Sequence, residues 1–222
     1  MSIDLTGVET VAFDAYGTLF DVHAAVGRHA GRVGPDAARL SEIWRAKQLE
    51  YSWVLSLAGR YEPFWNLTSR ALAHALARCP GVDPSVEPLL LDAYRTLAAY
   101  PEVAGVLSRL RAEGRVTAIL SNGDPGMLGS AVAAAGLGAL LDHVISADAV
   151  GVFKTDPRVY QLVEKHAGTT PERTLFVSSN RWDVAGAAAF GFRCVWVNRL
   201  GLPDEYEGLE PVARMADLSA LA

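Results

Sequence analysis

Two aspartates and a lysine each follow a short apolar run in this 222-residue sequence. Asp14 comes directly after the run Val8 to Phe13. Lys154 and Asp183 follow two later runs, each after a short loop. A carboxylate can act as a nucleophile or a general base, and a neighbouring ammonium group keeps it ionised. Taken singly, each has an ordinary structural explanation, as a turn aspartate or a solvated lysine. Together, in strand order, they predict a catalytic site.

Five apolar runs are predicted to form the strands that position these side chains. They lie at Val8 to Phe13, Val116 to Leu120, His143 to Ser146, Thr174 to Val177 and Cys194 to Val197. From about residue 115 onward the runs alternate with helix patterns, in which Asp-Pro pairs at 124 and 156 indicate helix starts. Glycines at 114, 168 and 191 indicate helix ends. This alternation favours an α/β fold with a Rossmann-like parallel sheet and helices on both faces.

Polar side chains follow all five predicted strands. Because the carboxyl ends of parallel strands meet at one edge of a sheet, we expect these side chains to lie close together there. They are Asp14, Tyr16, Thr18, Ser121, Asn122, Lys154, Ser178, Ser179, Asn180, Asp183, Asn198 and Arg199, and Gly123 follows Asn122 in the same loop.

Residues 21–98 contain no convincing strand and at least three helix patterns. We interpret them as a helical-bundle cap inserted after the first strand, so that residues 1–20 and 99–222 form the core. The clearest helix is predicted from Asp36 to Ala58. One apolar stripe at helical spacing predicts the face that packs on the rest of the insertion. It consists of Leu40, Ile43, Trp44, Lys47, Tyr51, Val54, Leu55 and Ala58.

Arg45, Leu49 and Trp53 form a second row on the opposite side of that helix. A helix that is apolar on two sides usually contacts two partners. Either the helix lies between neighbours or subunits, or Arg45 points from this row into a cleft between the insertion and the core.

Composition narrows the classes of function. Half of the residues are hydrophobic, and the formal net charge of -5 offers no electrostatic footprint for nucleic acid. The longest mostly apolar stretch, Ala131 to Leu141, is too short to span a bilayer, and no leader pattern is evident, so a cytoplasmic location is expected. Cys79 and Cys194 have no paired spacing for zinc or a redox couple. Any anionic substrate must therefore be attracted by a few local cations.

Four motifs together resemble a known family. FDAYGTLFDV, LSNG, a lysine before a helix, and SSNRWD are similar to the haloacid dehalogenase superfamily, and specifically to its L-2-haloacid dehalogenase branch. The resemblance covers most of the chain and includes IWRAKQLEYSW at Ile43 to Trp53. One departure is Thr155, because that family usually follows its lysine with proline, and its loss weakens the restraint on the turn that aims Lys154.

The resemblance implies hydrolysis of a small 2-halocarboxylate through a covalent ester. Asp14 would attack C2 with inversion, Lys154 would hold and orient Asp14, and a halide ion would leave toward Arg45. The substrate carboxylate would be bound by Ser121, with neighbouring backbone N–H groups and Asn122.

The second half of the implied reaction is attack of water on the Asp14 ester. Asp183 would be the base, positioned by Ser178 and Asn180. Thr18 would fix the rotamer of Asp14. Five residues would line a dry substrate pocket, although each of them also suits a packing role. They are Tyr16, Leu49, Phe64, Tyr160 and Trp182.

A metal-dependent phosphatase of the same superfamily is the nearest alternative. Those phosphatases carry a second aspartate two residues after the nucleophile, where this sequence has Tyr16. They also place an acidic pair after the fourth strand, where this sequence has SSN before the single Asp183. Such a donor set suits magnesium poorly, so we expect no metal and no cofactor. A non-catalytic protein that retains the fold and a dehalogenase for fluoroacetate-like compounds remain as alternatives. The family resemblance further implies a homodimer formed through the insertion's helices.

Overall fold

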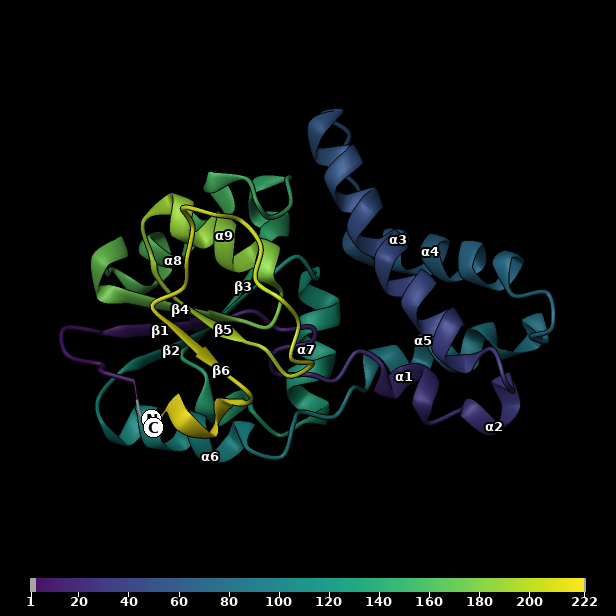
Figure 1. The fold of residues 1–222 in the computed structure, drawn as a ribbon, viewed down its shortest axis with the longest axis horizontal. Helices are drawn as coiled ribbons and strands as arrows, with labels where there is room; N and C mark the ends of the chain where they lie inside the picture. The colour runs from purple at the N-terminus through teal and green to yellow at the C-terminus, as the bar shows by residue number, and fades with distance from the viewer. Residues whose placement is uncertain (1–2, 222) are drawn as a thin grey trace.

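The structure is a computed structural model that describes residues 3–221, and it has two lobes. One lobe is built around a sheet, and the other holds the helices that follow the first strand (Figure 1). Both termini lie on the sheet lobe, at the side away from the helical lobe. Within residues 3–221, no helix is long and apolar enough to cross a membrane.

Six parallel strands form the sheet, in the order β3-β2-β1-β4-β5-β6. The strands are β1 (Thr10–Phe13), β2 (Val116–Ser121), β3 (His143–Ser146), β4 (Thr174–Ser178), β5 (Arg193–Val197) and β6 (Ala213–Met215). The five predicted strands are confirmed to within two residues at each end. The three-residue edge strand β6 was not predicted, because a segment of this length carries no periodicity. β1 lies between β2 and β4, so the loops after these three strands are neighbours.

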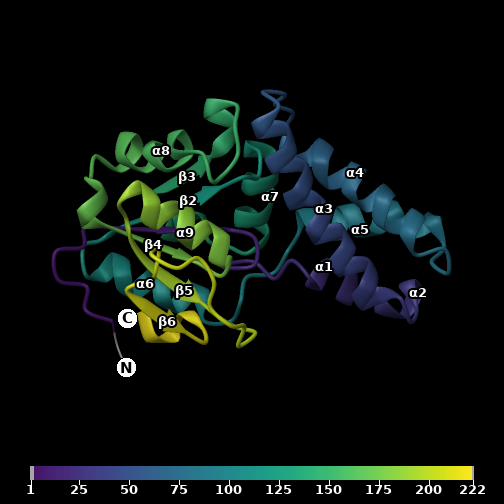
Figure 2. The ribbon, with the colours of Figure 1, turned by 45° about the horizontal axis from the view of Figure 1, so that its top comes forward.

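Helices cover both faces of the sheet (Figure 2). Val11 and Phe13 of β1 join a core cluster with α6 (Val103–Ala112) and α7 (Pro125–Ala134). Ala12, which points to the opposite face, joins a second cluster with α8 (Pro157–Ala167) and α9 (Arg181–Phe190). Alternate side chains of β1 therefore pack into two separate hydrophobic clusters, one on each face of the sheet. This arrangement confirms the predicted parallel α/β fold.

The predicted helix boundaries have the expected capping contacts. The Asp124 carboxylate accepts a hydrogen bond from Met127 N at 3.1 Å and begins α7. The Asp156 carboxylate accepts one from Arg158 N at 2.9 Å and begins α8. Gly168 ends α8 in the left-handed conformation that glycine adopts without strain. These caps fix where the loops beside the carboxyl edge of the sheet give way to helices.

The second lobe contains five helices between residues 24 and 95 of the described chain. They are α1 (Ala24–Gly27), α2 (Ala30–Val33), α3 (Ala37–Leu57), α4 (Phe64–Arg78) and α5 (Glu87–Arg95). The two connections between the lobes run side by side, because Phe20 forms an antiparallel bridge with Ala99. Asp21 N also donates to Ala98 O at 3.2 Å. This pairing supports the proposed division of the chain into residues 1–20, 21–98 and 99–222.

The buried face of α3 differs from the predicted apolar stripe. Gln48 and Ser52 are buried, whereas Val54, a predicted member of the stripe, is 55% exposed. Gln48 can be buried because its side-chain amide donates to Thr68 Oγ1 of α4 at 2.9 Å. The last turns of α3 project beyond the rest of the helical lobe, which leaves Val54 without a partner (Figure 1). The stripe assignment was therefore wrong for Val54 and Ala58, which are exposed, whereas Tyr51 and Leu55 pack against the core cluster as predicted.

Candidate active site

Asp14 follows β1 and holds its carboxylate in three hydrogen bonds. One oxygen, Oδ2, accepts from Thr18 Oγ1 at 3.0 Å and from Asn180 Nδ2 at 2.9 Å. The other oxygen, Oδ1, accepts from Lys154 Nζ at 3.0 Å. The backbone N–H of Asp14 donates to Val177 O on β4 at 2.9 Å, which ties the residue to the neighbouring strand end. The carboxylate is nearly buried and has a fixed orientation.

Lys154 is 1% exposed, and its ammonium group lies between two carboxylates. Its Nζ atom donates to Asp14 and, at 2.8 Å, to Asp183 Oδ2. Burial by itself lowers the pKa of Lys154, but the two carboxylates outweigh burial and raise the pKa above its usual value. The backbone N–H of Lys154 donates to the side-chain oxygen of Asn122 at 2.9 Å, so the loop after β2 positions the lysine. With Thr155 in place of proline, Lys154 still contacts both carboxylates.

Asp183 lies on the first turn of α9 and is fully buried. Its Oδ2 accepts from Lys154, and its Oδ1 accepts from Tyr160 OH at 2.8 Å. Burial raises the pKa of Asp183 to about 6, and the negative charge of Asp14 adds to this effect, while Lys154 opposes it. A carboxylate with this pKa is a stronger base than an ordinary aspartate.

The loop after β4 is built around the Thr18 hydroxyl. Ser179 N donates to Thr18 Oγ1 at 2.8 Å, and Asn180 N donates to the buried Ser178 hydroxyl at 3.1 Å. Gly17 adopts a φ of +97°, and a Cβ atom there would lie 3.1 Å from Ser179 Oγ. Glycine at this position therefore lets the loops after β1 and β4 meet, and this contact places Asn180 against Asp14.

Arg45 reaches the site from the helical lobe. Its Nη2 atom donates to Tyr16 O at 3.2 Å and to Asn180 Oδ1 at 3.4 Å. Leu49, one turn further along α3, lines the same hollow as Tyr16, Arg45 and Trp182. Of the two alternatives for the second row of α3, the structure therefore places Arg45 in the cleft between the lobes. The Arg45 guanidinium therefore lies near Asp14, and among the described residues it forms no ion pair with a carboxylate.

Ser121 and Asn122 use their acceptor atoms inside the site. The Ser121 hydroxyl oxygen accepts from Gly123 N at 3.1 Å, and the Asn122 oxygen accepts from Lys154 N. Their remaining hydroxyl and amide hydrogens are donors, which suits an anionic ligand at the start of α7.

Two predicted pocket residues lie elsewhere. Tyr160 is fully buried in α8 among aromatic side chains, and its hydroxyl donates to Asp183, so it lies behind Asp183 and is not a pocket wall. Phe64 is buried at the start of α4 and packs edge-on against Phe153, with 5.6 Å between ring centroids. Helical spacing could not separate these positions from pocket positions, since the depth of a helix in the fold decides them.

Tyr94 is a residue of the site's surroundings that sequence reasoning missed. It lies on α5, is fully buried, and stacks on Tyr16 with 5.6 Å between ring centroids and 16° between ring planes. Its hydroxyl donates to Gln48 Oε1 at 3.4 Å. Tyr16 is also pressed against Gly123, where a Cβ atom would lie 2.8 Å from its ring. No motif marks Tyr94, because its role depends on a contact between the two lobes.

The fold and the aspartate-lysine site define a hydrolase of the haloacid dehalogenase type. The family model for a haloacid dehalogenase-like hydrolase matches residues 8–191, and the chain belongs to this family. A relative, the (S)-2-haloacid dehalogenase 1 of Pseudomonas sp. (strain CBS-3), is 46% identical over 215 residues, which cover 96% of this chain and 95% of the relative. This relative confirms the resemblance to the L-2-haloacid dehalogenase branch.

Solved structures agree with this placement. A dehalogenase crystallised as an intermediate complex is 44% identical, has a TM-score of 0.94, and is matched over 96% of this chain and 95% of its own. The L-2-haloacid dehalogenase of Xanthobacter autotrophicus, solved with chloropropionic acid covalently bound, is 39% identical with a TM-score of 0.87, and the match covers 96% of each chain.

Proposed function

We propose that this protein hydrolyses short (S)-2-haloacids to (R)-2-hydroxyacids and halide, through an ester formed on Asp14 and without a metal ion. One observation carries the proposal. Lys154 Nζ lies between the two carboxylates and balances their charge, at 3.0 Å from Asp14 Oδ1 and 2.8 Å from Asp183 Oδ2. The nucleophile is thus braced by an ammonium group, which leaves it free to attack carbon.

In the first step, a carboxylate oxygen of Asp14 forms a bond to C2 of the substrate while the carbon–halogen bond breaks. The bonding electron pair leaves with the halide, so this step needs no proton donor. The Arg45 guanidinium receives the halide after releasing its two long hydrogen bonds to Tyr16 O and Asn180 Oδ1. Ser121 and Asn122 bind the substrate carboxylate. Attack from the side opposite the halogen inverts C2, which gives the (R) product.

In the second step, water attacks the side-chain carbonyl carbon of Asp14. Asp183 takes one proton from this water, and the bond between the Asp14 carbonyl and the product oxygen breaks. The hydroxyacid leaves with one proton of the water, the second proton is released with the halide as acid, and the Asp14 carboxylate is restored. The raised pKa of Asp183 suits a base that works near neutral pH.

A phosphatase would need a different site. Phosphoryl transfer depends on metal ions that neutralise phosphate oxygens and on a donor for the leaving group. Tyr16 stands where that donor would be, and its carbonyl faces Arg45. The Lys154 ammonium group already balances both buried carboxylates.

Halide release from each enantiomer of 2-chloropropionate in the presence of EDTA tests the proposed function. We expect release from the L form, D-lactate as product, no loss with EDTA, and no activity in Asp14→Asn. Release that stops with EDTA, or magnesium-dependent turnover of p-nitrophenyl phosphate, would overturn the proposal.

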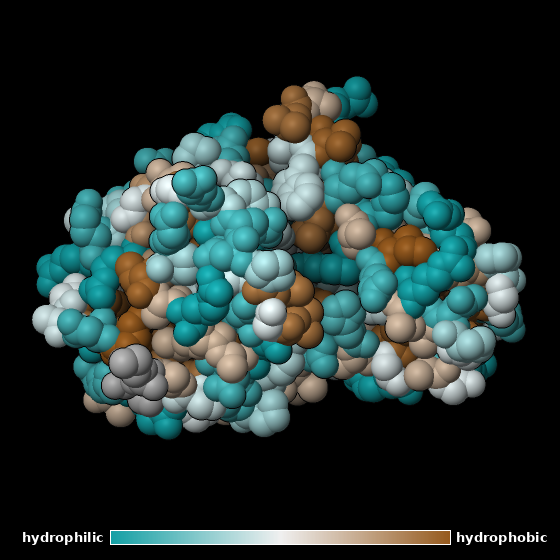
Figure 3. Space-filling view, in the orientation of Figure 1, coloured by the Kyte–Doolittle hydropathy of each residue, from teal (hydrophilic) through white to brown (hydrophobic). Residues whose placement is uncertain are grey.

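We further propose a cytoplasmic homodimer whose partners are small 2-halocarboxylates and not nucleic acid. Val54 and Leu57 are 55% and 91% exposed at the free end of α3, where Figure 3 shows a hydrophobic cluster. An exposed apolar patch of this kind supports association with a second copy. Cys79 and Cys194 are both buried free thiols, which suits a reducing compartment. Light scattering of the wild type and Leu57→Glu tests the dimer, because a charge at this end should favour monomers.

A further inference from the structure

The second row of α3 crosses from one hollow of the molecule to another. Arg45 and Leu49 line a hollow of about 300 Å³ beside Asn180, which we call the inner hollow. Trp53, one turn further along, lines a larger hollow of about 750 Å³, which we call the outer hollow. The proposed reaction uses Arg45 and Leu49 but gives no role to Trp53.

Trp182 is the side chain that the two hollows share among the described residues. It belongs to α9 of the sheet lobe and lies next to Asp183 in sequence. Trp53 meets it from the helical lobe in an edge-to-face contact, with 5.4 Å between ring centroids and 84° between ring planes. The two rings therefore join the lobes at the boundary between the hollows.

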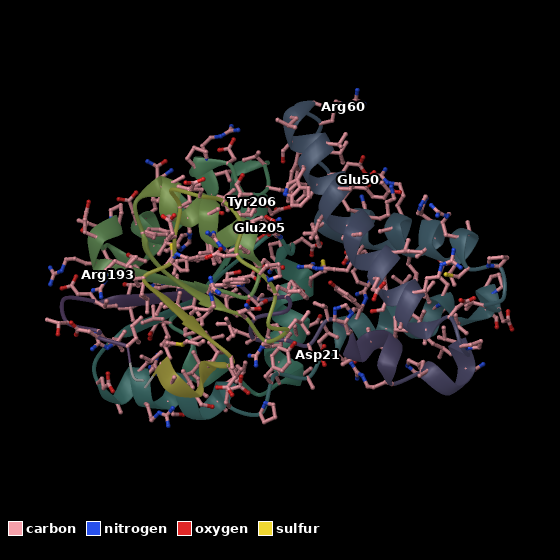
Figure 4. The ribbon with its side chains drawn as sticks, in the orientation of Figure 1. Asp21, Glu50, Arg60, Arg193, Glu205 and Tyr206 are labelled. Carbon is pink, nitrogen blue, oxygen red and sulfur yellow. The ribbon has the colours of Figure 1, made fainter. Side chains whose placement is uncertain are left out.

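The segment between β5 and β6 crosses the same boundary. Glu205 lines the inner hollow, whereas the next residue, Tyr206, lines the outer hollow. Figure 4 shows both on the side of the sheet lobe that faces α3. A second stretch of chain thus passes from one hollow to the other.

The two hollows differ in chemistry. The inner hollow has Arg45, Asn180 and the hydroxyl of Ser179, which suit a departing halide. The outer hollow is lined mainly by apolar and aromatic side chains, among them Leu57, Phe190 and Leu209. Its volume and apolar walls suit an alkyl chain.

Resting on the proposed function, we propose that Trp53 sets the chain length of the substrate by bracing Trp182 as a partition. The carboxylate of a 2-haloacid is bound by Ser121 and Asn122, its halogen faces Arg45 in the inner hollow, and the carbon chain beyond C3 meets the Trp182 ring. Without Trp53, Trp182 can move aside, and the outer hollow becomes a site for the alkyl tail of longer 2-haloalkanoic acids. Trp53 is thus a specificity-determining residue that acts through Trp182.

The ratio of kcat/KM for 2-bromohexanoate to that for 2-bromopropionate tests the partition. In Trp53→Ala this ratio should rise by about tenfold or more, because each methylene that finds an apolar site contributes substantially to discrimination. Trp53→Phe, which keeps an aromatic ring, should largely restore the wild-type ratio. Trp65→Ala is the matched control, since it removes a tryptophan of the same lobe that lines neither hollow, and it should leave the ratio unchanged.

Two outcomes separate this inference from the proposed function. If the wild type releases bromide from 2-bromopropionate but Trp53→Ala keeps the wild-type ratio, the partition is wrong and the proposed function stands. If the wild type releases no bromide, the proposed function fails. The partition is then still tested by calorimetric binding of 2-hydroxyhexanoate and lactate, where Trp53→Ala should favour the longer acid by the same factor, and equal preference in both proteins would overturn it.

Discussion

Lys154 donates from Nζ to Asp183 Oδ2 at 2.8 Å, and both side chains are shielded from solvent. A buried ion pair of this kind is costly to break, because removal of one partner leaves an uncompensated charge in a poorly solvated place. Here the same ammonium also contacts Asp14, so one cation stabilises the proposed nucleophile and the proposed base together.

Lys154→Met should lower both stability and activity. With Asp14 and Asp183 left without a cation, unfolding free energy at neutral pH should fall by about 3 to 5 kcal/mol. Loss of the group that orients the nucleophile should reduce kcat at least about a hundredfold. Urea unfolding and halide release measure the two effects. The stability loss should shrink at about pH 5, because protonation of Asp183 removes its uncompensated charge.

Lys165→Met provides the control, since Lys165 is an exposed lysine of α8. Lys165→Met should change neither the free energy of unfolding nor kcat. Equal effects of the two substitutions would contradict a special role for Lys154.

The pKa of Asp183 predicts opposite pH dependences for stability and activity. Burial raises this pKa from 3.8 to about 6, so the folded chain binds the proton more tightly than the unfolded chain. The contribution of Asp183 to stability is therefore fully present below pH 3.8 and decreases as pH rises toward 6. Ester hydrolysis, by contrast, needs the ionised form, so kcat should rise over the same window.

Rapid-quench experiments at about pH 5 should show the ester accumulating, because a protonated Asp183 cannot take the proton of the attacking water. Asp183→Asn should give the same burst of one halide per site at neutral pH, and mass spectrometry should find the added acyl group on Asp14. A variant that turns over without such a burst would show that Asp183 is not the base.

Arg45→Ala should slow halide departure by about a hundredfold while the fold is kept, since Arg45 is only half-buried. The defect should be larger for 2-chloropropionate than for 2-bromopropionate, because chloride is the poorer leaving group and depends more on the guanidinium. Arg39→Ala, which removes an exposed arginine from the same helix, is the matched control. A defect independent of the halogen would contradict Arg45 as the halide acceptor.

The strands, their parallel arrangement and the polar cluster at the carboxyl edge of the sheet could be predicted from sequence. They depend on local patterns, since each apolar run ends where its polar residue begins, and topology then brings Asp14, Lys154 and Asp183 together. Helix caps at Asp124 and Asp156 are equally local.

Contacts between distant elements could not be predicted in this way. The burial of Gln48 depends on Thr68 of a different helix, and the position of Tyr94 depends on Tyr16 of the other lobe. The family resemblance alone places Tyr160 in the pocket wall, and its position one turn into a helix does not show which residue its side chain contacts. The structure shows that its neighbour there is Asp183.

Tyr160→Phe separates these two roles of Tyr160. The hydrogen bond from its hydroxyl lowers the pKa of Asp183, so its removal should raise that pKa above about 6 and move the acid limb of kcat to higher pH. KM for 2-chloropropionate should stay the same, because the Tyr160 ring lies in the core behind Asp183. Tyr61→Phe is the matched control, since it removes a hydroxyl that contacts Asp148 and should leave the pH profile unchanged. A raised KM with an unchanged pH profile would return Tyr160 to the pocket wall, because only a side chain that contacts substrate changes binding without changing the titration of the base.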